Sequence, residues 1–526
     1  LRNHLNSKNS LHQNQFGFTR GKSPELAVNT VISTISSALQ SSPFVSVISL
    51  DITGAFDHAW WPLIYHRLHM VNPPEYVLSI IHSYLTERSI TFNHNATSIS
   101  RPLVRGCPQG SVLGPTLWNI LFNDLLSINL PGASQIFCFA DDTLLICRAD
   151  TVEELTVLTN ECLTHIDCWM SNSHLSLNAQ KTQACIYTKR KPHEYDSPVF
   201  QLKDCVIVPS STFKYLGLIF DNGFYWAAHL RSLQQRCKVL MHTMSQVCGN
   251  LFGYSFRARQ IMFLGIVRCL FYYCSSAFYH RLHLKSFQEI LTKSIRPLLI
   301  ATIYGYRTIS TPAAHVLADC PPLHLSVIAR SLRWLCKNQL PIHSWHSFEK
   351  FFLIPGTSPT MYALRDSEET SRCVSEHGLK LFLQEQIYAQ WQSEWDNSEK
   401  GVTTWFLIPK VEERHLSPLQ PNFFLTQALT GHGCFLEYLH RFNLRPNPQC
   451  ACCCGSTQTS FHILYDCPDY SYIRDPENFS AETNVFSEEF HRTATKIIRA
   501  LWSQDQSNTI RHRNRYRSRH RQLTLH

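Results

Sequence analysis

The sequence has no signal peptide and no long uninterrupted hydrophobic run. Its most apolar stretch, Ile261–Phe278, is interrupted by Arg268 and diluted by tyrosine and serine, which favours a buried helix and excludes a membrane partner. Charged residues make up only 17% of the chain and hydrophobic residues 44%, so we expect a folded protein of about two to four domains. The chain begins with Leu1 and not with Met, which predicts a fragment of a longer reading frame.

Cysteine, in contrast, is abundant, with 20 residues. Most are scattered through apolar segments, as Cys138, Cys147 and Cys162 are, and a reduced cysteine there behaves as a small hydrophobic residue. This distribution predicts a reducing, intracellular compartment. The net charge of +9 is compatible with a nucleic-acid partner, although many proteins without one have a similar charge.

Two adjacent carboxylates stand between two apolar segments of strand length. Ser134–Cys138 and Leu144–Cys147 flank Phe139-Ala140-Asp141-Asp142-Thr143, a pattern that predicts a hairpin with the acidic pair at its turn. The two carboxylates would repel each other and lose hydration there unless a cation lies over them. A solvated turn is the alternative, because Asp is a common turn residue.

A third carboxylate follows another predicted strand. Phe44–Leu50 has the pattern of a buried strand and leads into Asp51–Asp57, which is followed by a helix-like run from Trp60 to Met70. If this strand and the acidic hairpin are neighbours in one sheet, Asp51 and Asp141 converge. Such a site can hold two Mg²⁺ ions about 3.5–4 Å apart, the arrangement used for in-line phosphoryl displacement.

Three motifs, in this order, resemble the palm of a reverse transcriptase. Asp51–Asp57 fits Asp-x-x-x-Ala-Phe-Asp, Gly106–Gly110 fits Gly-x-Pro-Gln-Gly, and Ala140–Asp142 supplies Ala-Asp-Asp. The residues around them are similar to those of non-LTR (LINE-type) retrotransposons of arthropods, most of all the clade that inserts into ribosomal DNA or telomeric repeats. The resemblance covers residues 15–467.

The resemblance implies a two-metal site. Asp141 would be the principal ligand beside Asp51, with Asp142 as the weaker partner and a backbone carbonyl lent by Ile52. Phe56 falls where the family places an aromatic ring beside the 2′ position of the sugar, and a bulky ring there selects deoxynucleotides. Ordinary core packing of Phe56 is the alternative.

Other residues would contact the incoming nucleotide. Gln109 offers a donor and an acceptor, and Gly110 lets the backbone pass close to a base or sugar. Arg20 and Lys22 are candidate ligands of the triphosphate, with a solvated basic loop as the alternative. Lys181 would hold the triphosphate or donate a proton to the leaving pyrophosphate, unless it is simply solvated.

One cluster of cysteines has the spacing of a metal site. The candidate ligands are Cys450, Cys452, Cys454, His462 and Cys467. Three thiolates and one imidazole suit tetrahedral Zn²⁺, and the resemblance implies a Cys-Cys-His-Cys knuckle. Gly455 favours Cys454 as the second ligand, which leaves either Cys450 or Cys452 as the first. Incidental cysteines are the alternative.

The expected fold class is α+β, a right-hand polymerase with fingers, palm and thumb and an α-rich C-terminal region that carries a small zinc knuckle. The expected parts are fingers and palm at 1–225, a helical thumb at 226–340, a helical and linker region at 341–445, the knuckle at 446–475, and a C-terminal helix with a basic tail at 476–526. The tail Arg511–Arg521 has six arginines and no apolar face, so we expect it to be disordered alone and suited to phosphate contacts.

The function implied by the resemblance is that of an RNA-directed DNA polymerase, a nucleotidyltransferase that extends a DNA primer on element RNA by target-primed reverse transcription. Its partners would be the RNA template, the DNA primer or target and dNTPs, and its cofactors two Mg²⁺ ions and Zn²⁺. It would act in the nucleus at integration and form a cytoplasmic ribonucleoprotein before that. A truncated, inactive nucleic-acid-binding remnant stays open, because the family's further fingers motif is absent upstream. Phe56 and the Pro108–Gly110 loop disfavour an RNA-directed RNA polymerase.

Overall fold

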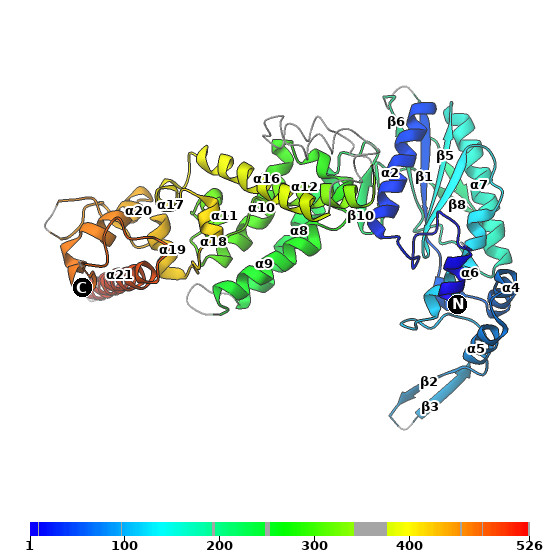
Figure 1. Ribbon diagram of the computed structural model, residues 1–526, viewed down its shortest axis with the longest axis horizontal. Helices are drawn as coiled ribbons and strands as arrows, with labels where there is room; N and C mark the ends of the chain where they lie inside the picture. Colours follow the sequence, from blue (N-terminus) through cyan, green and yellow to red (C-terminus); the bar gives the residue numbers. More distant parts are fainter. Residues whose placement is uncertain are drawn as a thin grey trace. The chain divides into compact units, whose positions relative to one another are not determined.

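The computed structural model describes residues 1–8, 10–95, 97–191, 195–247, 253–340, 376–452, 455–475 and 477–523. The chain divides into two compact units, unit 1 at Leu1–His229 and unit 2 at Leu230–His526 (Figure 1). Residues 341–375, the start of the helical and linker region expected at 341–445, lie outside the described residues. Within the described ranges, no helix has both the length and the apolar character needed to cross a membrane.

The centre of unit 1 is a four-stranded antiparallel sheet with the strand order β4-β5-β1-β6. Its strands are β1 (Phe44–Leu50), β4 (Ser134–Phe139), β5 (Asp142–Ala149) and β6 (Gln183–Thr188). Strand β1 lies between β5 and β6, with Leu50 opposite Thr143. The predicted strand and the predicted acidic hairpin are both confirmed, and they are neighbours in one sheet.

Two long helices, α2 (Pro24–Ser41) and α7 (Val152–Asn172), lie on either side of this sheet (Figure 1). Helix α7 begins with a capping box: the Thr151 hydroxyl accepts from the Glu154 N–H, and the Glu154 carboxylate accepts from the Thr151 N–H. The Ser46 hydroxyl of β1 contacts that of Thr159 in α7 at 2.8 Å. Because both faces of the sheet are covered, β1 is apolar almost without interruption.

Short helices and hairpins complete unit 1. They are α1 (Arg2–Ser7), α3 (Ala55–His58), α4 (Trp61–Val71), α5 (Glu75–Leu85), β2 (Ser89–His94), β3 (Thr97–Pro102), α6 (Gly114–Phe122), η1 (Asn123–Ser127), β7 (Phe200–Leu202), β8 (Cys205–Ile207), β9 (Thr212–Tyr215) and β10 (Leu218–Asp221). In the core, the ring of Phe122 stacks on Trp118 and meets Trp169 of α7 edge-on. These aromatic contacts join the short helices to the layer under the sheet.

Unit 2 is almost entirely helical, which confirms the helical character predicted for 226–338. Its elements are α8 (Ala227–Val247, which begins at the end of unit 1), α9 (Phe256–Phe271), η3 (Ser275–Ala277), η4 (Tyr279–Arg281), α10 (Lys285–Thr302), α11 (Thr311–Ala318), α12 (Leu323–Lys337), α16 (Glu376–Asp396), α17 (Val402–Leu407), α18 (Val411–Leu416), α19 (Phe423–Thr430), α20 (Leu436–Arg441), η5 (His462–Asp466), η6 (Pro468–Ile473) and α21 (Glu488–Leu523).

The last helix of unit 2, α21, begins at Glu488 and is bounded by Leu523, so the basic segment Arg511–Arg521 falls within its bounds. Its first half packs through Phe490 and Ile497, which are buried. The disorder expected of the basic tail on its own stays a prediction.

Candidate active site

The sheet of unit 1 brings three carboxylates together. Asp51 follows β1, Asp141 lies in the hairpin turn and Asp142 begins β5, while Leu50 pairs with Thr143 across the two strands. The pKa of Asp142 is raised from 3.8 to about 6. Crowding of its carboxyl group by protein atoms is the largest cause, although the residue itself is exposed, and repulsion by Asp141 and Asp51 adds to it. The predicted convergence of these side chains is present in the structure.

The acidic turn has an unusual backbone that its neighbours hold in place. Phe139 pairs with Asp142, so Ala140 and Asp141 form a two-residue turn, and Ala140 has a φ of 59°. That left-handed conformation is strained for a residue with a side chain. The Gln15 side-chain oxygen accepts hydrogen bonds from the backbone N–H groups of Ala140, at 3.2 Å, and Gly17, at 3.1 Å.

The segment around Gln15 pairs with the edge strand β4. The N–H of Cys138 donates to the carbonyl of Asn14 at 2.9 Å, and the N–H of Phe16 donates to the carbonyl of Cys138 at 2.8 Å. Gln15 itself is fully buried. A Cβ on Gly17 would lie 2.2 Å from the backbone nitrogen of Ala140, so only glycine fits at this approach.

Sequence reasoning missed these supporting residues. It assigned nucleotide contacts to the cations after Gln15–Phe18 but no role to Gln15 or Gly17. A third residue, Asn119, donates from its side-chain amide to the carbonyl of Gly17 at 2.7 Å and is also buried. The sequence did offer a signal, because Gln15 stands next to aromatic residues and a glycine. A buried amide side chain needs hydrogen-bond partners, so a supporting role could have been inferred.

The loop after α7 contacts the backbone of Asp51 and Ile52. The N–H of Asn178 donates to the carbonyl of Asp51 at 2.8 Å, and Ile52 pairs with Leu177 in an antiparallel bridge. Lys181 belongs to the same loop, is exposed, and donates its backbone N–H to the Asn178 side chain at 3.3 Å. The loop therefore carries Lys181 on the segment that pairs with the first metal-ligand candidates.

Phe56 forms part of an aromatic stack. Its ring lies parallel to Trp118, with centroids 5.2 Å apart and planes 19° from parallel, and Phe18 meets it edge-on at 6.2 Å. Phe56 is half-buried. Packing on Trp118 restricts the ring to one orientation, as a steric selector requires.

The loop with Gln109 is attached to the same segment. The N–H of Cys107 donates to the carbonyl of Phe56 at 2.7 Å, and Gln109 donates from its side-chain amide to Asp57 at 3.4 Å. Gly110 has a φ of 79° and open space where a Cβ would stand. Gln109 and Gly110 therefore lie on an exposed loop joined to the residue proposed to contact the sugar.

The two cations near the N-terminus have different surroundings. The Lys22 ammonium donates to the backbone carbonyls of Gln13 and Gln15, the latter at 3.1 Å, and lies over the ring of Phe16. Burial lowers the pKa of Lys22. Lys22 thus holds the segment that supports the acidic turn, whereas Arg20 is exposed.

Unit 2 contains a second candidate site, a Cys/His cluster. Its members are Cys450, Cys452, His462 and Cys467, whose potential ligand atoms all lie within 4.8 Å of one another. The Sγ atoms of Cys450 and Cys467 are 3.7 Å apart, and Cys452 Sγ lies 3.3 Å from His462 Nε2. Zn–S bonds of about 2.3 Å and Zn–N bonds of about 2.0 Å in a tetrahedron require separations of about 3.8 and 3.5 Å, so these residues fit Zn²⁺. The structure gathers both Cys450 and Cys452, and Cys454 lies outside the described residues.

Comparison with known proteins bears on this geometry. Residues 1–220 match the family described as "Reverse transcriptase (RNA-dependent DNA polymerase)". The chain is 27% identical, over 89% of its length and 43% of the relative, to a Drosophila melanogaster protein named "Putative 115 kDa protein in type-1 retrotransposable element R1DM". It is 28% identical, over 88% of its length and 44% of the relative, to the "Retrovirus-related Pol polyprotein from type-1 retrotransposable element R1" of Bradysia coprophila. A telomerase structure from Candida tropicalis aligns at a TM-score of 0.34 and 11% identity, over 79% of this chain and 54% of that one, a likeness too low to carry an argument.

The part of the chain that matches the reverse transcriptase family, residues 1–220, thus contains the sheet and the three carboxylates. The chain is a relative of the RNA-directed DNA polymerases of arthropod non-LTR retrotransposons of the R1 and jockey types. It spans less than half the length of the two R1 relatives above, 43% and 44%.

Proposed function

We propose that this chain is an RNA-directed DNA polymerase that extends a DNA primer on a retrotransposon RNA by target-primed reverse transcription. The observation that carries the proposal is the convergence of Asp51, Asp141 and Asp142 at one end of the sheet, inside a reverse transcriptase domain. Loss of hydration, and then repulsion by Asp141 and Asp51, raise the pKa of Asp142. Bound divalent cations relieve that repulsion, which is why such a cluster suits them.

Asp51 and Asp141, with Asp142 and the backbone carbonyl of Ile52, would hold two Mg²⁺ ions. When bound, the ions lower the pKa of the primer's 3′-hydroxyl and neutralise charge on the leaving pyrophosphate. The raised pKa of Asp142, about 6, means that this carboxyl group takes up a proton below that pH. Its affinity for a cation should therefore fall below about pH 6.

The surrounding residues would position the dNTP. Phe56, restricted by its stack on Trp118, would exclude a 2′-hydroxyl, and the Gln109–Gly110 loop would contact the nucleotide without reading its base. Arg20 and Lys181, both exposed, would bind the triphosphate. Lys22 would act by supporting the loop that carries Arg20.

We further propose the finer division of the chain. Residues 1–225 would be the fingers and palm and 226–340 the thumb, followed by the C-terminal region with its zinc knuckle at 446–475. The Cys/His cluster would hold Zn²⁺ and order a small nucleic-acid-binding module. The partners would be element RNA and target DNA, met in a cytoplasmic ribonucleoprotein and then in the nucleus.

Primer extension on an RNA template with dNTPs and Mg²⁺ tests the proposal. We expect extension by the wild type and its loss in Asp141→Ala. Asp150→Ala is the matched control, because Asp150 is an exposed aspartate just beyond the other end of β5 and should leave extension unchanged. Replacing dNTPs by rNTPs should abolish extension if the enzyme makes DNA.

Two outcomes would contradict parts of the proposal. Equal extension by wild type and Asp141→Ala would remove Asp141 from the metal site. Extension by neither, from protein that is folded and bound to the template, would identify a nucleic-acid-binding remnant without polymerase activity.

A further inference from the structure

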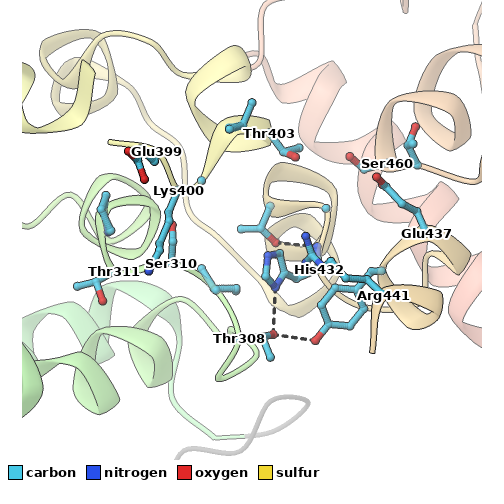
Figure 2. A pocket seen from close by; sticks show the side chains of 18 of the residues that line it. Thr308, Ser310, Thr311, Glu399, Lys400, Thr403, His432, Glu437, Arg441 and Ser460 are labelled. Atoms are coloured by element: carbon cyan, nitrogen blue, oxygen red, sulfur yellow. Dashed lines mark hydrogen bonds between the residues drawn. The ribbon is translucent and has the colours of Figure 1, made fainter. Parts of the chain in front are cut away.

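Unit 2 contains a pocket of about 920 Å³ that the polymerase proposal does not use (Figure 2). Its lining comes from Arg296 of α10, the start of α11 with the loop before it, the start of α17 with the turn before it, the end of α19, helix α20, and the segment 459–461 before the metal-ligand candidate His462. Seven of the lining residues are serine or threonine, so hydroxyl donors surround the space. Its volume is in the range of small-ligand sites.

The pocket carries a small excess of positive charge. Its lining has three cations, Arg296, Lys400 and Arg441, and two carboxylates, Glu399 and Glu437, a net of +1 (3 − 2). Figure 2 shows Lys400 and Arg441 on different walls. This balance suits one phosphodiester, with a single negative charge, and disfavours a free triphosphate or a polyacidic ligand.

Two of the three cations are available to a ligand. Arg296 is engaged, since its guanidinium donates to Thr311 Oγ1 at 2.9 Å and to the carbonyl of Arg307 at 2.6 Å. Lys400 and Arg441 are exposed, and no carboxylate of the described residues lies within ion-pair distance of either.

Three side chains of the pocket lining, those of His432, Thr308 and Tyr438, form a chain of hydrogen bonds. His432 Nδ1 lies 3.0 Å from the Thr308 hydroxyl, which lies 2.7 Å from the Tyr438 hydroxyl (Figure 2). Burial, with repulsion by Arg441, lowers the pKa of His432 to about 4, so the imidazole is neutral near pH 7. The positive charge of the pocket therefore resides on arginine and lysine.

Aromatic rings stand next to the available arginine. The Arg441 guanidinium lies 5.6 Å from the centre of the Tyr438 ring and 5.4 Å from that of Phe442. Phe442 is 44% exposed and lines the pocket. A guanidinium beside an exposed ring is the combination that binds a phosphate together with a stacked base, whereas an acidic peptide needs no exposed ring.

We propose that this pocket binds one unpaired nucleotide of a single-stranded nucleic acid, with its phosphodiester held by Arg441 and Lys400 and its base stacked on Phe442. RNA and DNA share this chemistry, and the experiment below separates them. The site lies outside the reverse transcriptase domain at 1–220, so it goes beyond the polymerase proposal and does not depend on catalysis.

The Cys/His cluster is joined to this pocket through Gln458. Its side-chain oxygen accepts from the N–H of Leu436, the first residue of α20, at 3.0 Å, and its amide donates to Cys450 Sγ at 3.5 Å. Helix α20 ends at Arg441. A metal bound by the cluster would thereby fix the helix that carries the arginine, which makes nucleotide binding in the pocket dependent on the metal.

The test uses the full chain loaded with Zn²⁺ and two labelled oligonucleotides, oligo(dT) and oligo(U), each carrying one 5-iodinated base for photocrosslinking. We expect crosslinks to peptides containing Tyr438 or Phe442. In fluorescence anisotropy, Phe442→Ala should weaken binding by about 5- to 160-fold, the range for one stacked base. Arg441→Gln should weaken binding by removing a phosphate contact. Arg441→Gln should also reduce the slope of log affinity against log salt by about 0.7.

Controls separate this effect from misfolding and from the palm. Lys293→Gln removes an exposed cation of unit 2 outside the pocket, paired with Glu289, and should change neither affinity nor slope. Arg441→Lys keeps the positive charge and should therefore keep the wild-type slope of log affinity against log salt. Extension of a saturating RNA–DNA primer-template should be unchanged in Phe442→Ala, so failure of the pocket and failure of the polymerase give different results.

Crosslinking of one oligonucleotide and not the other identifies RNA or DNA as the natural strand and supports the proposal, as does crosslinking of both. Crosslinks confined to unit 1, with unchanged affinity in Phe442→Ala and Arg441→Gln, would overturn it. Equal competition by a polyglutamate peptide would also overturn it, in favour of an acidic protein partner.

Discussion

Gln15 provides the sharpest test of how the acidic turn is held. We expect Gln15→Met, which keeps the volume but removes the acceptor, to loosen the turn at Ala140 and Asp141. Two buried N–H groups, those of Gly17 and Ala140, lose their partner, at about 1–3 kcal/mol each. The Gln15 amide nitrogen is itself buried and without a partner among the described residues, so its removal returns about 1–2 kcal/mol. Taken at the middle of each range, the two lost hydrogen bonds cost about 4 kcal/mol and the removed amide returns about 1.5 kcal/mol, so the net loss is about 2–3 kcal/mol of local stability.

Hydrogen exchange of a peptide covering residues 137–144, followed by mass spectrometry in EDTA, measures this change. A loss of about 2–3 kcal/mol corresponds to about 30- to 160-fold faster exchange if the turn opens locally. Gln135→Met, the same substitution at an exposed position of β4, is the control and should leave exchange unchanged. Exchange in Gln15→Met within about threefold of the wild type would refute the reasoning, since the two bonds would then contribute nothing.

Three further predictions concern the metal sites and the sugar. Because the folded-state pKa of Asp142 is raised from 3.8 to about 6, the folded protein without metal keeps a proton that the unfolded chain has lost, so its stability should fall as the pH rises from about 4 to 6. Denaturant midpoints in EDTA should show this fall, and Asp142→Asn or added Mg²⁺ should flatten it; an identical slope in Asp142→Asn would contradict the assignment. Cys467→Ser should remove one thiolate ligand and release Zn²⁺, measured by a chromogenic chelator, whereas Cys168→Ser, at an exposed cysteine of unit 1, should release none. Phe56→Val should improve rNTP incorporation relative to dNTP by about 10- to 100-fold in single-nucleotide extension, and an unchanged ratio would assign Phe56 to the core.

Much of the site could be predicted because its parts are encoded locally. The apolar run Phe44–Leu50 and the two segments that flank Asp141 and Asp142 each have the length and composition typical of a buried strand. Once both are strands, pairing between them is the simplest way to bury them, and that pairing places Asp51 beside the turn. The order of the motifs along the chain was therefore enough to predict the cluster of carboxylates.

The supporting contacts could not be predicted in this way. Gln15 reaches Ala140 across 125 positions, and Thr308 meets His432 and Tyr438 across more than a hundred. No local propensity specifies such pairs, because a side chain's partner depends on which distant backbone the fold brings within about 3 Å of it.

The sequence by itself determined the strands, the helical character of the second half and the chemical nature of both candidate metal sites. Only the tertiary structure decided that Cys450 and Cys452 gather with His462. It also placed Arg441 and Phe442 beside a pocket. The physical reason is the same in both cases: periodic burial is recorded in neighbouring residues, whereas the meeting of ligands and the lining of a pocket depend on contacts made by residues far apart in the chain.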